Sequence, residues 1–229
     1  MSTPSKVGVI ILSYNKSWIL PEFFASLEAQ NRKPDQVVVV DDKSTDGTQE
    51  LLRAKYWRYP TVNLIVNIGQ AAARNVGLKC LKTQYVLFLD GDVIMRPNMI
   101  KSMERCLDSH PEVSIAYCHY DRHGSRTDHV RSNEWDAKRL MSVNYVSMIS
   151  MVRKEHLPSP AMDESLKRYE DWDLWIRMMK SGYCGKLINE PLFVAHYRKG
   201  DLSGTGESDE WRRIVEKKHG FQRERVVRR

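Results

Sequence analysis

The sequence has no long hydrophobic run. Its longest apolar stretches, such as Val37–Val40 and Tyr85–Leu89, are far shorter than the roughly 20 residues that a helix needs to cross a bilayer. The first residues, MSTPSK, contain no signal-type apolar core, so we expect neither secretion nor import. The sequence therefore predicts a cytoplasmic protein without a transmembrane segment.

Cysteine, glycine, proline and repeated segments are also scarce. The four cysteines are widely spaced and form no CxxC pair, which excludes a disulfide framework and a structural zinc site. Twelve glycines and nine prolines in 229 residues exclude a collagen-like or low-complexity chain. The chain has no internal repeat and no zinc-finger or helix-turn-helix pattern, so we expect one ordinary domain with a single core.

Positive charge is unevenly distributed along the chain. The formal net charge is +7, and residues 211–229 hold eight basic and two acidic residues, which account for six of those seven charges. The remainder of the chain is nearly neutral. The basicity is therefore a property of the C-terminal end, where a solvated terminus, an anionic membrane surface and nucleic acid are the alternatives.

The first half alternates two sequence periods. Short apolar runs rich in β-branched residues predict buried parallel strands at 7–13, 36–40, 62–66 and 85–89. Between them, apolar residues at helical spacing predict helices at 18–30, 46–56 and 70–81, with Asp46 as N-cap of the second. This order predicts a doubly wound sheet whose ligand site lies at the carboxyl ends of the strands.

The second half follows a less regular pattern. We expect helices at 97–107, 169–181 and 208–219, strands at 113–120, 144–152 and 186–196, a polar segment rich in His and Arg at 121–136 and a loop at 199–207. Trp172 and Trp175 fall on the apolar face of the 169–181 helix, which favours core packing over a sugar platform. In the 208–219 helix, an apolar face at Trp211, Ile214 and Val215 would leave the basic side chains of residues 212, 213, 217 and 218 in solvent.

Carboxylates gather where the predicted strands end. Asp90 and Asp92 follow one strand, and because they are two residues apart in an extended segment, both can face one site. Asp41 and Asp42 end the strand at 36–40, at the same edge of the sheet. Oxygen ligands of this kind suit a hard divalent cation, with water and substrate phosphates completing its coordination.

The chain resembles the inverting glycosyltransferases of family 2, which have the GT-A fold. The matching motifs are SYN at 13–15, DDKSTDGT at 41–48, Gly69 with AAARNVGL at 71–78, LDGDV at 89–93, NYVSMISMVRK at 144–154 and YEDWDLWIR at 169–177. They span about residues 6–205 in the family's order. The resemblance implies a single α/β domain at 1–207, with a Rossmann-like donor half at about 6–95, an acceptor half at about 96–207 and a mixed central sheet, followed by a basic helix and tail at 208–229.

The resemblance also implies roles for the donor half. Ser13 and Tyr14 would contact the donor. Asp42 would bind its base, with Asp41 supporting that loop. Arg74 in the AAARNVGL motif would also lie beside the donor. Asp90 in the LDGDV motif would meet the ribose or a water molecule bound to the metal. A solvated helix face is the alternative for Arg74.

A metal shell and a base are implied in the same way. Asp92 would ligate Mn²⁺ or Mg²⁺, with Asp90 and His196 completing the shell; a surface histidine without a ligand is the alternative for His196. Inverting transfer needs a base that deprotonates the acceptor hydroxyl. By resemblance Asp171 is that base and Glu170 its neighbour, whereas without the resemblance both are ordinary acidic residues at a helix N-terminus.

These features predict a metal-dependent hexosyltransferase that uses a nucleotide sugar. Leu12 stands where some uridine-binding relatives have a hydroxyl side chain, so GDP-sugars and dTDP-sugars are alternatives to a UDP-sugar. We expect a glycan acceptor, with hydroxymethylated DNA or a lipid-linked acceptor as alternatives; for DNA, the segment after the fifth strand offers Arg122, His123, Arg126, His129 and Arg131. A competing hypothesis is a non-catalytic module that binds polyanions on a vestigial fold.

Overall fold

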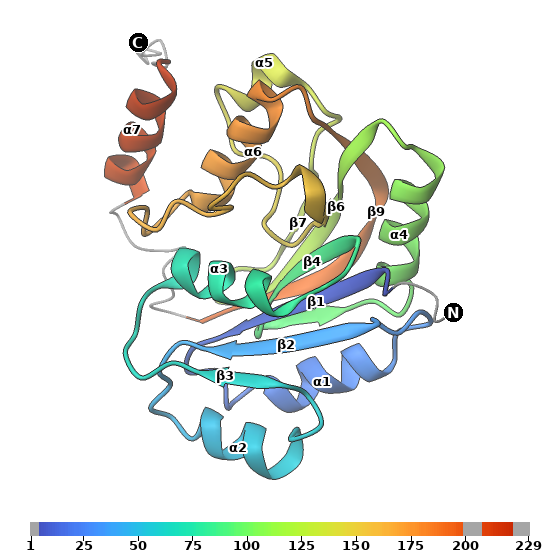
Figure 1. The fold of residues 1–229 in the computed structure, drawn as a ribbon, viewed down its shortest axis with the longest axis vertical. Helices are drawn as coiled ribbons and strands as arrows, with labels where there is room; N and C mark the ends of the chain where they lie inside the picture. Colours follow the sequence, from blue (N-terminus) through green and yellow to red (C-terminus); the bar gives the residue numbers. More distant parts are fainter. Residues whose placement is uncertain (1–4, 199–207, 222–229) are drawn as a thin grey trace.

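The protein is built around one mixed sheet (Figure 1). The structure is a computed structural model and describes residues 5–198 and 208–221. The strand order is β3-β2-β1-β4-β8-β6-β9-β5, and β7 pairs with β6. The predicted loop at 199–207 and the tail at 222–229 lie outside the described residues. No helix in the described part of the chain is long and apolar enough to cross a membrane.

The N-terminal half of the sheet is parallel. It is formed by β1 (Val7–Ser13), β2 (Gln36–Asp41), β3 (Thr61–Asn63) and β4 (Tyr85–Asp90). The four predicted parallel strands are thus confirmed, although β3 ends at Asn63 and not at Val66. All seven residues of β1 are buried because helices cover both faces of the sheet at this point.

Helices connect these strands and pack on opposite faces. Helices α1 (Leu20–Glu28), α2 (Thr48–Lys55) and α4 (Met99–Ser109) share one apolar core, whereas α3 (Gln70–Cys80) and α6 (Glu170–Lys180) share the other. Figure 1 shows α1 and α3 on opposite sides of β1. Gly47, and not Asp46, precedes the first residue of α2, while the Asp46 carboxylate accepts a hydrogen bond from the Thr48 amide at 3.1 Å.

The C-terminal half adds antiparallel pairs. Strand β8 (Met151–Arg153) lies antiparallel to β4 and β6 (Val113–Gly124), and β9 (Cys184–Tyr197) runs parallel to β6. Strands β5 (Val93–Met95) and β7 (Asp128–Val130) were not predicted. The predicted strand at 144–152 is wrong for its first seven residues, which form a loop. The polar segment at 121–136 holds the end of β6 and all of β7, and α5 (Ala137–Leu140) begins directly after it.

The large aromatic side chains of α6 belong to the core. Trp172 and Trp175 are both buried, and their indole N–H groups donate to the carbonyl oxygens of Leu140 at 2.6 Å and Val146 at 2.9 Å. The prediction that they pack in the core is confirmed. Because these bonds tie α6 to the chain segment before β8, they fix the helix that begins with Glu170.

Helix α3 lies unusually close to the sheet at Gly77. A β-carbon at this position would lie 2.6 Å from Ile10 Cγ2 in β1. We expect Gly77→Val to lower the free energy of unfolding by about 1–3 kcal/mol, because the added atoms overpack this contact. Urea unfolding measures the change, with Lys79→Val on the exposed side of α3 as the matched control. Equal stability of the two variants would contradict the close packing of α3.

Candidate active site

The candidate site lies where three parallel strands end. In the sheet register, Leu12 of β1 is opposite Asp90 of β4, and Ser13 is opposite Asp41 of β2. The predicted convergence of the strand ends is therefore confirmed. Ser13 Oγ is buried and has no hydrogen-bond partner within residues 5–198 and 208–221, while Tyr14 next to it is 46% exposed. A polar atom and an aromatic ring thus end β1 at this edge.

The two aspartates after β2 hold the adjoining loops. Asp41 is fully buried and accepts hydrogen bonds from the Ser44 amide at 3.0 Å and Gln49 Nε2 at 2.6 Å. Asp42 accepts from the backbone amides of Ile68 at 2.8 Å and Gly69 at 2.9 Å. Asp42 therefore links the end of β2 to the loop before α3, and its predicted contact with a base stays a prediction.

Arg74 connects the two halves of the domain. This side chain of α3 is 2% exposed and donates to Asp90 Oδ1 at 2.7 Å and to Glu170 Oε1 at 2.6 Å. Burial alone would lower the pKa of Arg74, but the two carboxylates raise it, so the guanidinium stays charged. The alternative of a solvated helix face is wrong. The contact brings together the motifs that contain Arg74, Asp90 and Glu170.

The two acidic residues at the start of α6 differ in burial: Glu170 is buried and Asp171 is partly exposed. Glu170 is 4% exposed, and burial raises its pKa to about 7 against the lowering effect of Arg74. Asp171 keeps part of its surface accessible, although burial also raises its pKa, a shift opposed by a hydrogen bond from Asn144. Asp171 is therefore the less buried residue of this pair.

Two contacts of the acidic pair were not predicted. Asn144 Nδ2 donates to Asp171 Oδ2 at 3.0 Å, and Gln70 Nε2 donates to Glu170 Oε2 at 3.0 Å. The amide orientation of Asn144 is set by the carboxylate, since only its NH₂ group can donate. Asn144 opens the NYVSM motif, which was the only signal available in the sequence. Its assignment to a strand concealed the role of its side chain.

Asp92 is paired with a cation from the chain itself. Lys16 Nζ lies 2.5 Å from Asp92 Oδ2, and both side chains are 19% exposed. Across the β5–β9 pair, the His196 amide donates to the Asp92 carbonyl oxygen at 3.0 Å, so the predicted metal residues Asp92 and His196 are neighbours. The His196 ring contacts the His123 ring, with centroids 5.2 Å apart.

The predicted metal ligands, Asp90, Asp92 and His196, provide few coordinating groups for a cation. Asp90 is engaged by Arg74, and within the described ranges no three side chains of His, Cys, Asp or Glu are grouped so that they could hold a metal ion. The donor set still fits a cation that takes one carboxylate, or a carboxylate and an imidazole, from the protein and its other ligands from a diphosphate and water. Such a site would be completed by substrate.

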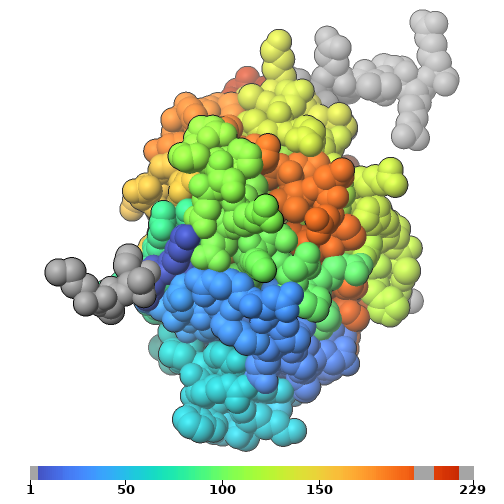
Figure 2. Space-filling model, turned by 90° about the vertical axis from the view of Figure 1, so that its right-hand side faces the viewer, coloured from blue at the N-terminus to red at the C-terminus, as the bar shows by residue number. Residues whose placement is uncertain are grey.

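The arginines proposed for DNA contact are largely paired with acids. Arg122 donates twice to Asp128 at 2.6 Å, Arg126 also reaches Asp128, and His129 contacts Asp121 at 2.7 Å. In Figure 2 the region of this β6–β7 hairpin, in yellow-green, lies at the right-hand edge of the visible face. The hairpin therefore presents a mixture of charges and not a purely basic surface.

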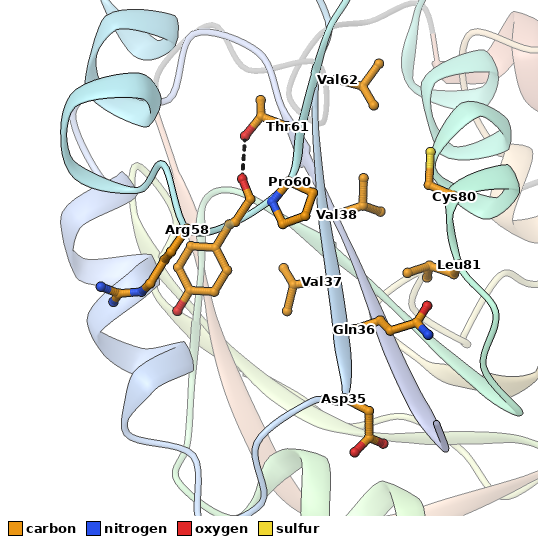
Figure 3. Close-up of a pocket in the computed structure, with 11 residues that line it drawn as sticks. Asp35, Gln36, Val37, Val38, Arg58, Pro60, Thr61, Val62, Cys80 and Leu81 are labelled. Carbon is orange, nitrogen blue, oxygen red and sulfur yellow. Dashed lines mark hydrogen bonds between the residues drawn. The ribbon is translucent and has the colours of Figure 1, made fainter. Parts of the chain in front are cut away.

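A separate groove lies away from these residues. It has a volume of about 530 Å³ and is lined by residues at the start of β2 and beside β3, among them Asp35, Arg58 and Cys80. Figure 3 shows the side chains of Val37, Val38 and Pro60 between Arg58 on one side of the view and Cys80 and Leu81 on the other. Asp41 and Asp42 stand at the other end of β2, so the groove is separate from the candidate site.

Comparison with known proteins identifies the family. A family model described as Glycosyl transferase family 2 matches residues 8–163, more than half of the chain. An uncharacterized glycosyltransferase of Haemophilus influenzae is 24% identical over 211 residues, which cover 86% of this chain and 71% of that protein. The teichoic acid poly(glycerol phosphate) polymerase of Staphylococcus epidermidis is 23% identical over 209 residues, 85% of this chain and 28% of the polymerase.

Solved structures share the fold. S. aureus TarS 1-349 in complex with UDP-GlcNAc has a TM-score of 0.73 and 23% identity, covering 92% of this chain and 65% of that chain. The chain thus spans less than two thirds of the length of that structure. The likeness confirms the predicted GT-A fold class, and together with the matched family model it shows that the chain belongs to glycosyl transferase family 2 and is a glycosyltransferase.

Proposed function

We propose that this domain transfers a sugar from a UDP-sugar to an acceptor hydroxyl with inversion at the anomeric carbon. The observation that carries the proposal is the Arg74 network, in which one buried guanidinium joins Asp90 of β4 to Glu170 beside Asp171. The nucleotide is proposed from TarS 1-349, whose structures contain UDP-GlcNAc and UDP.

Asp171 would act as the base. Its accessible carboxylate removes the proton of the acceptor hydroxyl while that oxygen attacks the anomeric carbon and the bond to the diphosphate breaks. Asn144 orients the carboxylate through its hydrogen bond to Oδ2. Glu170 supports the same turn of α6 through Arg74 and Gln70, and both of its oxygens are used in these contacts.

Asp92 would hold Mn²⁺ or Mg²⁺, with His196 beside it and Asp90 toward the ribose. A divalent cation there would offset the negative charge that develops on the departing diphosphate. Lys16, already within 2.5 Å of Asp92, is a second positive charge at this position. Ser13, Tyr14 and Asp42 would surround the nucleoside at the ends of β1 and β2.

A glycan is the proposed acceptor. The pairing of Arg122 and Arg126 with Asp128 reduces the free positive charge that DNA binding would need, so it favours a neutral acceptor over hydroxymethylated DNA. A lipid-linked acceptor thereby becomes the second choice, ahead of DNA.

A panel of sugar nucleotides tests the function. Release of nucleoside diphosphate is measured from UDP-, GDP- and dTDP-sugars, with Mn²⁺, Mg²⁺ or EDTA, alone and with glycan, lipid-linked or hydroxymethylated DNA acceptors. We expect UDP release that requires a divalent cation and increases with a glycan acceptor. Failure to bind or cleave any sugar nucleotide would support the non-catalytic alternative instead.

The raised pKa values of the acidic pair predict the pH dependence of turnover. A base must be ionised to accept a proton, and the pair contains Glu170 with a pKa of about 7 and Asp171 with a pKa above its ordinary value. We therefore expect kcat/KM for UDP-sugar cleavage to rise with pH across pH 6–8. The measurement is a pH–rate profile at constant ionic strength. A profile already flat above pH 5.5 would contradict the assignment of this pair.

A further inference from the structure

We propose that Lys218 and His219 of α7 (Ser208–His219) are positioning residues for sugar transfer, because through Asp173 they hold the turn of α6 that carries Glu170 and Asp171. The proposal rests on the proposed role of Asp171 as the base. It assigns the C-terminal helix to the catalytic machinery of the domain, although the sequence favoured an appended basic end.

Asp173 is the centre of the contact between the two helices. Its side chain is fully buried and lies 2.6 Å from Lys218 Nζ, 2.8 Å from His219 Nε2 and 2.8 Å from Arg177 Nε. The His219 side chain is itself only 5% exposed. Burial alone would raise the pKa of Asp173, but the contacts with His219 and Lys218 hold it at about 2, so the carboxylate is ionised. A buried charge of this kind depends on its partners.

The start of α6 has a backbone conformation that needs such support. Tyr169, directly before Glu170, has a φ of +59°, which a residue with a β-carbon rarely adopts. Conformations of this type persist where the surrounding contacts fix them. The amide of Asp173 donates to the carbonyl oxygen of Tyr169 at 2.9 Å, so the residue held by α7 is bonded directly to the strained one.

The same helix also covers Trp172. The Arg212 guanidinium lies 6.0 Å from the centre of the Trp172 ring, the Phe221 ring lies 5.6 Å away, and Val215 is fully buried in the core that contains Trp172. Helix α7, together with Phe221 two residues beyond it, therefore contacts both residues that follow Asp171. Lys218 is exposed as expected, whereas Arg212 is only partly exposed, and both also make contacts within the domain that were not predicted.

These contacts reach the base through its hydrogen bonds. Asp171 accepts from the Trp172 amide at 2.7 Å and from Asn144 Nδ2 at 3.0 Å. A shift of the first turn of α6 would move the amide of Trp172 and change the distance to Asn144, which belongs to another segment. Since a displacement of about 1 Å can reduce turnover about 100-fold, the α7 contacts influence catalysis without touching substrate.

The experiment compares variants of the full chain. His219→Ala and Lys218→Ala remove the two contacts, His219→Gln and Lys218→Arg keep a donor at each position, and Lys217→Ala and Arg213→Ala alter exposed side chains of the same helix. For each, hydrogen–deuterium exchange is followed in a peptide spanning 169–175, and kcat and KM are measured for UDP-GlcNAc cleavage with Mn²⁺.

We expect both alanine variants to exchange faster at 169–175 and to lose about 10-fold in kcat, with KM for UDP-GlcNAc changed less than twofold. The conservative variants should recover at least half of kcat, and the exposed controls should match the wild type. A lower melting temperature with unchanged kcat and unchanged exchange would overturn the proposal, since it indicates a purely structural contact.

Asp171→Asn separates this proposal from the proposed function. Wild-type turnover by Asp171→Asn would contradict the base assignment, whatever the α7 variants do. Loss of turnover in Asp171→Asn combined with full kcat in His219→Ala and Lys218→Ala would instead overturn only the positioning role.

Discussion

Replacing Arg74 with alanine should both destabilise the domain and abolish sugar transfer. The substitution leaves Glu170 buried beside Asp90 without the guanidinium that bonds to both, and removing one partner of a buried ion pair costs about 3–5 kcal/mol. We expect this loss in the free energy of unfolding from urea titrations. Activity should fall below detection, because the turn that carries Asp171 loses its ion pair with α3 and keeps only the hydrogen bond from Gln70 to Glu170.

Two further variants refine this result. Arg74→Lys keeps one positive charge but cannot donate to two carboxylates at once, so we expect it to recover part of the stability and little of the activity. Lys79→Ala, on an exposed position of the same helix, should change stability by less than about 0.5 kcal/mol. Wild-type stability of Arg74→Ala would show that the buried network is not formed in solution.

Replacing Asp171 with asparagine should reduce kcat while the protein stays folded. Asparagine has nearly the same shape but cannot accept the proton of the acceptor hydroxyl, and general base catalysis contributes about 10²–10⁴-fold to the rate. We expect a loss of this size in transfer, with UDP binding by calorimetry within about threefold of wild type, since Asp171 would contact the acceptor and not the nucleotide.

The choice of control matters for this variant. Glu155→Gln alters an exposed acidic side chain directly after β8, which lies outside the proposed base, donor and α7 contacts. It should keep most of the transfer activity. If Asp171→Asn kept normal kcat while Glu170→Gln lost it, the roles of the two acids would have to be exchanged.

The sequence could predict the strand ends but not the pairing of the side chains beyond them. Asp41 and Asp90 were placed correctly because apolar β-branched runs define parallel strands, and parallel strands end at a common edge. The sequence did not decide whether Arg74 lies beside the donor or on a solvated helix face, since helical periodicity does not identify the contacts of a polar residue. Its partner Glu170 lies 96 residues further along the chain, beyond the reach of any local pattern.

Errors in the second half have a similar cause. The apolar residues of 144–152 have strand-like composition, yet only Met151 and Val152 are in β8, because tertiary contacts such as the bond from Trp175 to Val146 hold the preceding segment as a loop. The ion pairs of Lys218 were not predicted because its acidic partners, Asp163 and Asp173, belong to distant elements. The composition of a segment gives its net charge but does not show which acidic and basic side chains form ion pairs.

The separation of Arg74 from Glu170 also bears on how the protein emerges from the ribosome. Synthesis at about 5–20 residues per second takes about 5–20 s to cover the 96 residues between them. During that interval a nascent chain holds β1–β4, Arg74 and Asp90 but no partner from α6. The donor half can thus assemble first with Arg74 paired to Asp90, and the guanidinium gains its second carboxylate, Glu170, only when α6 has been translated. The complete site is therefore a late product of cotranslational folding.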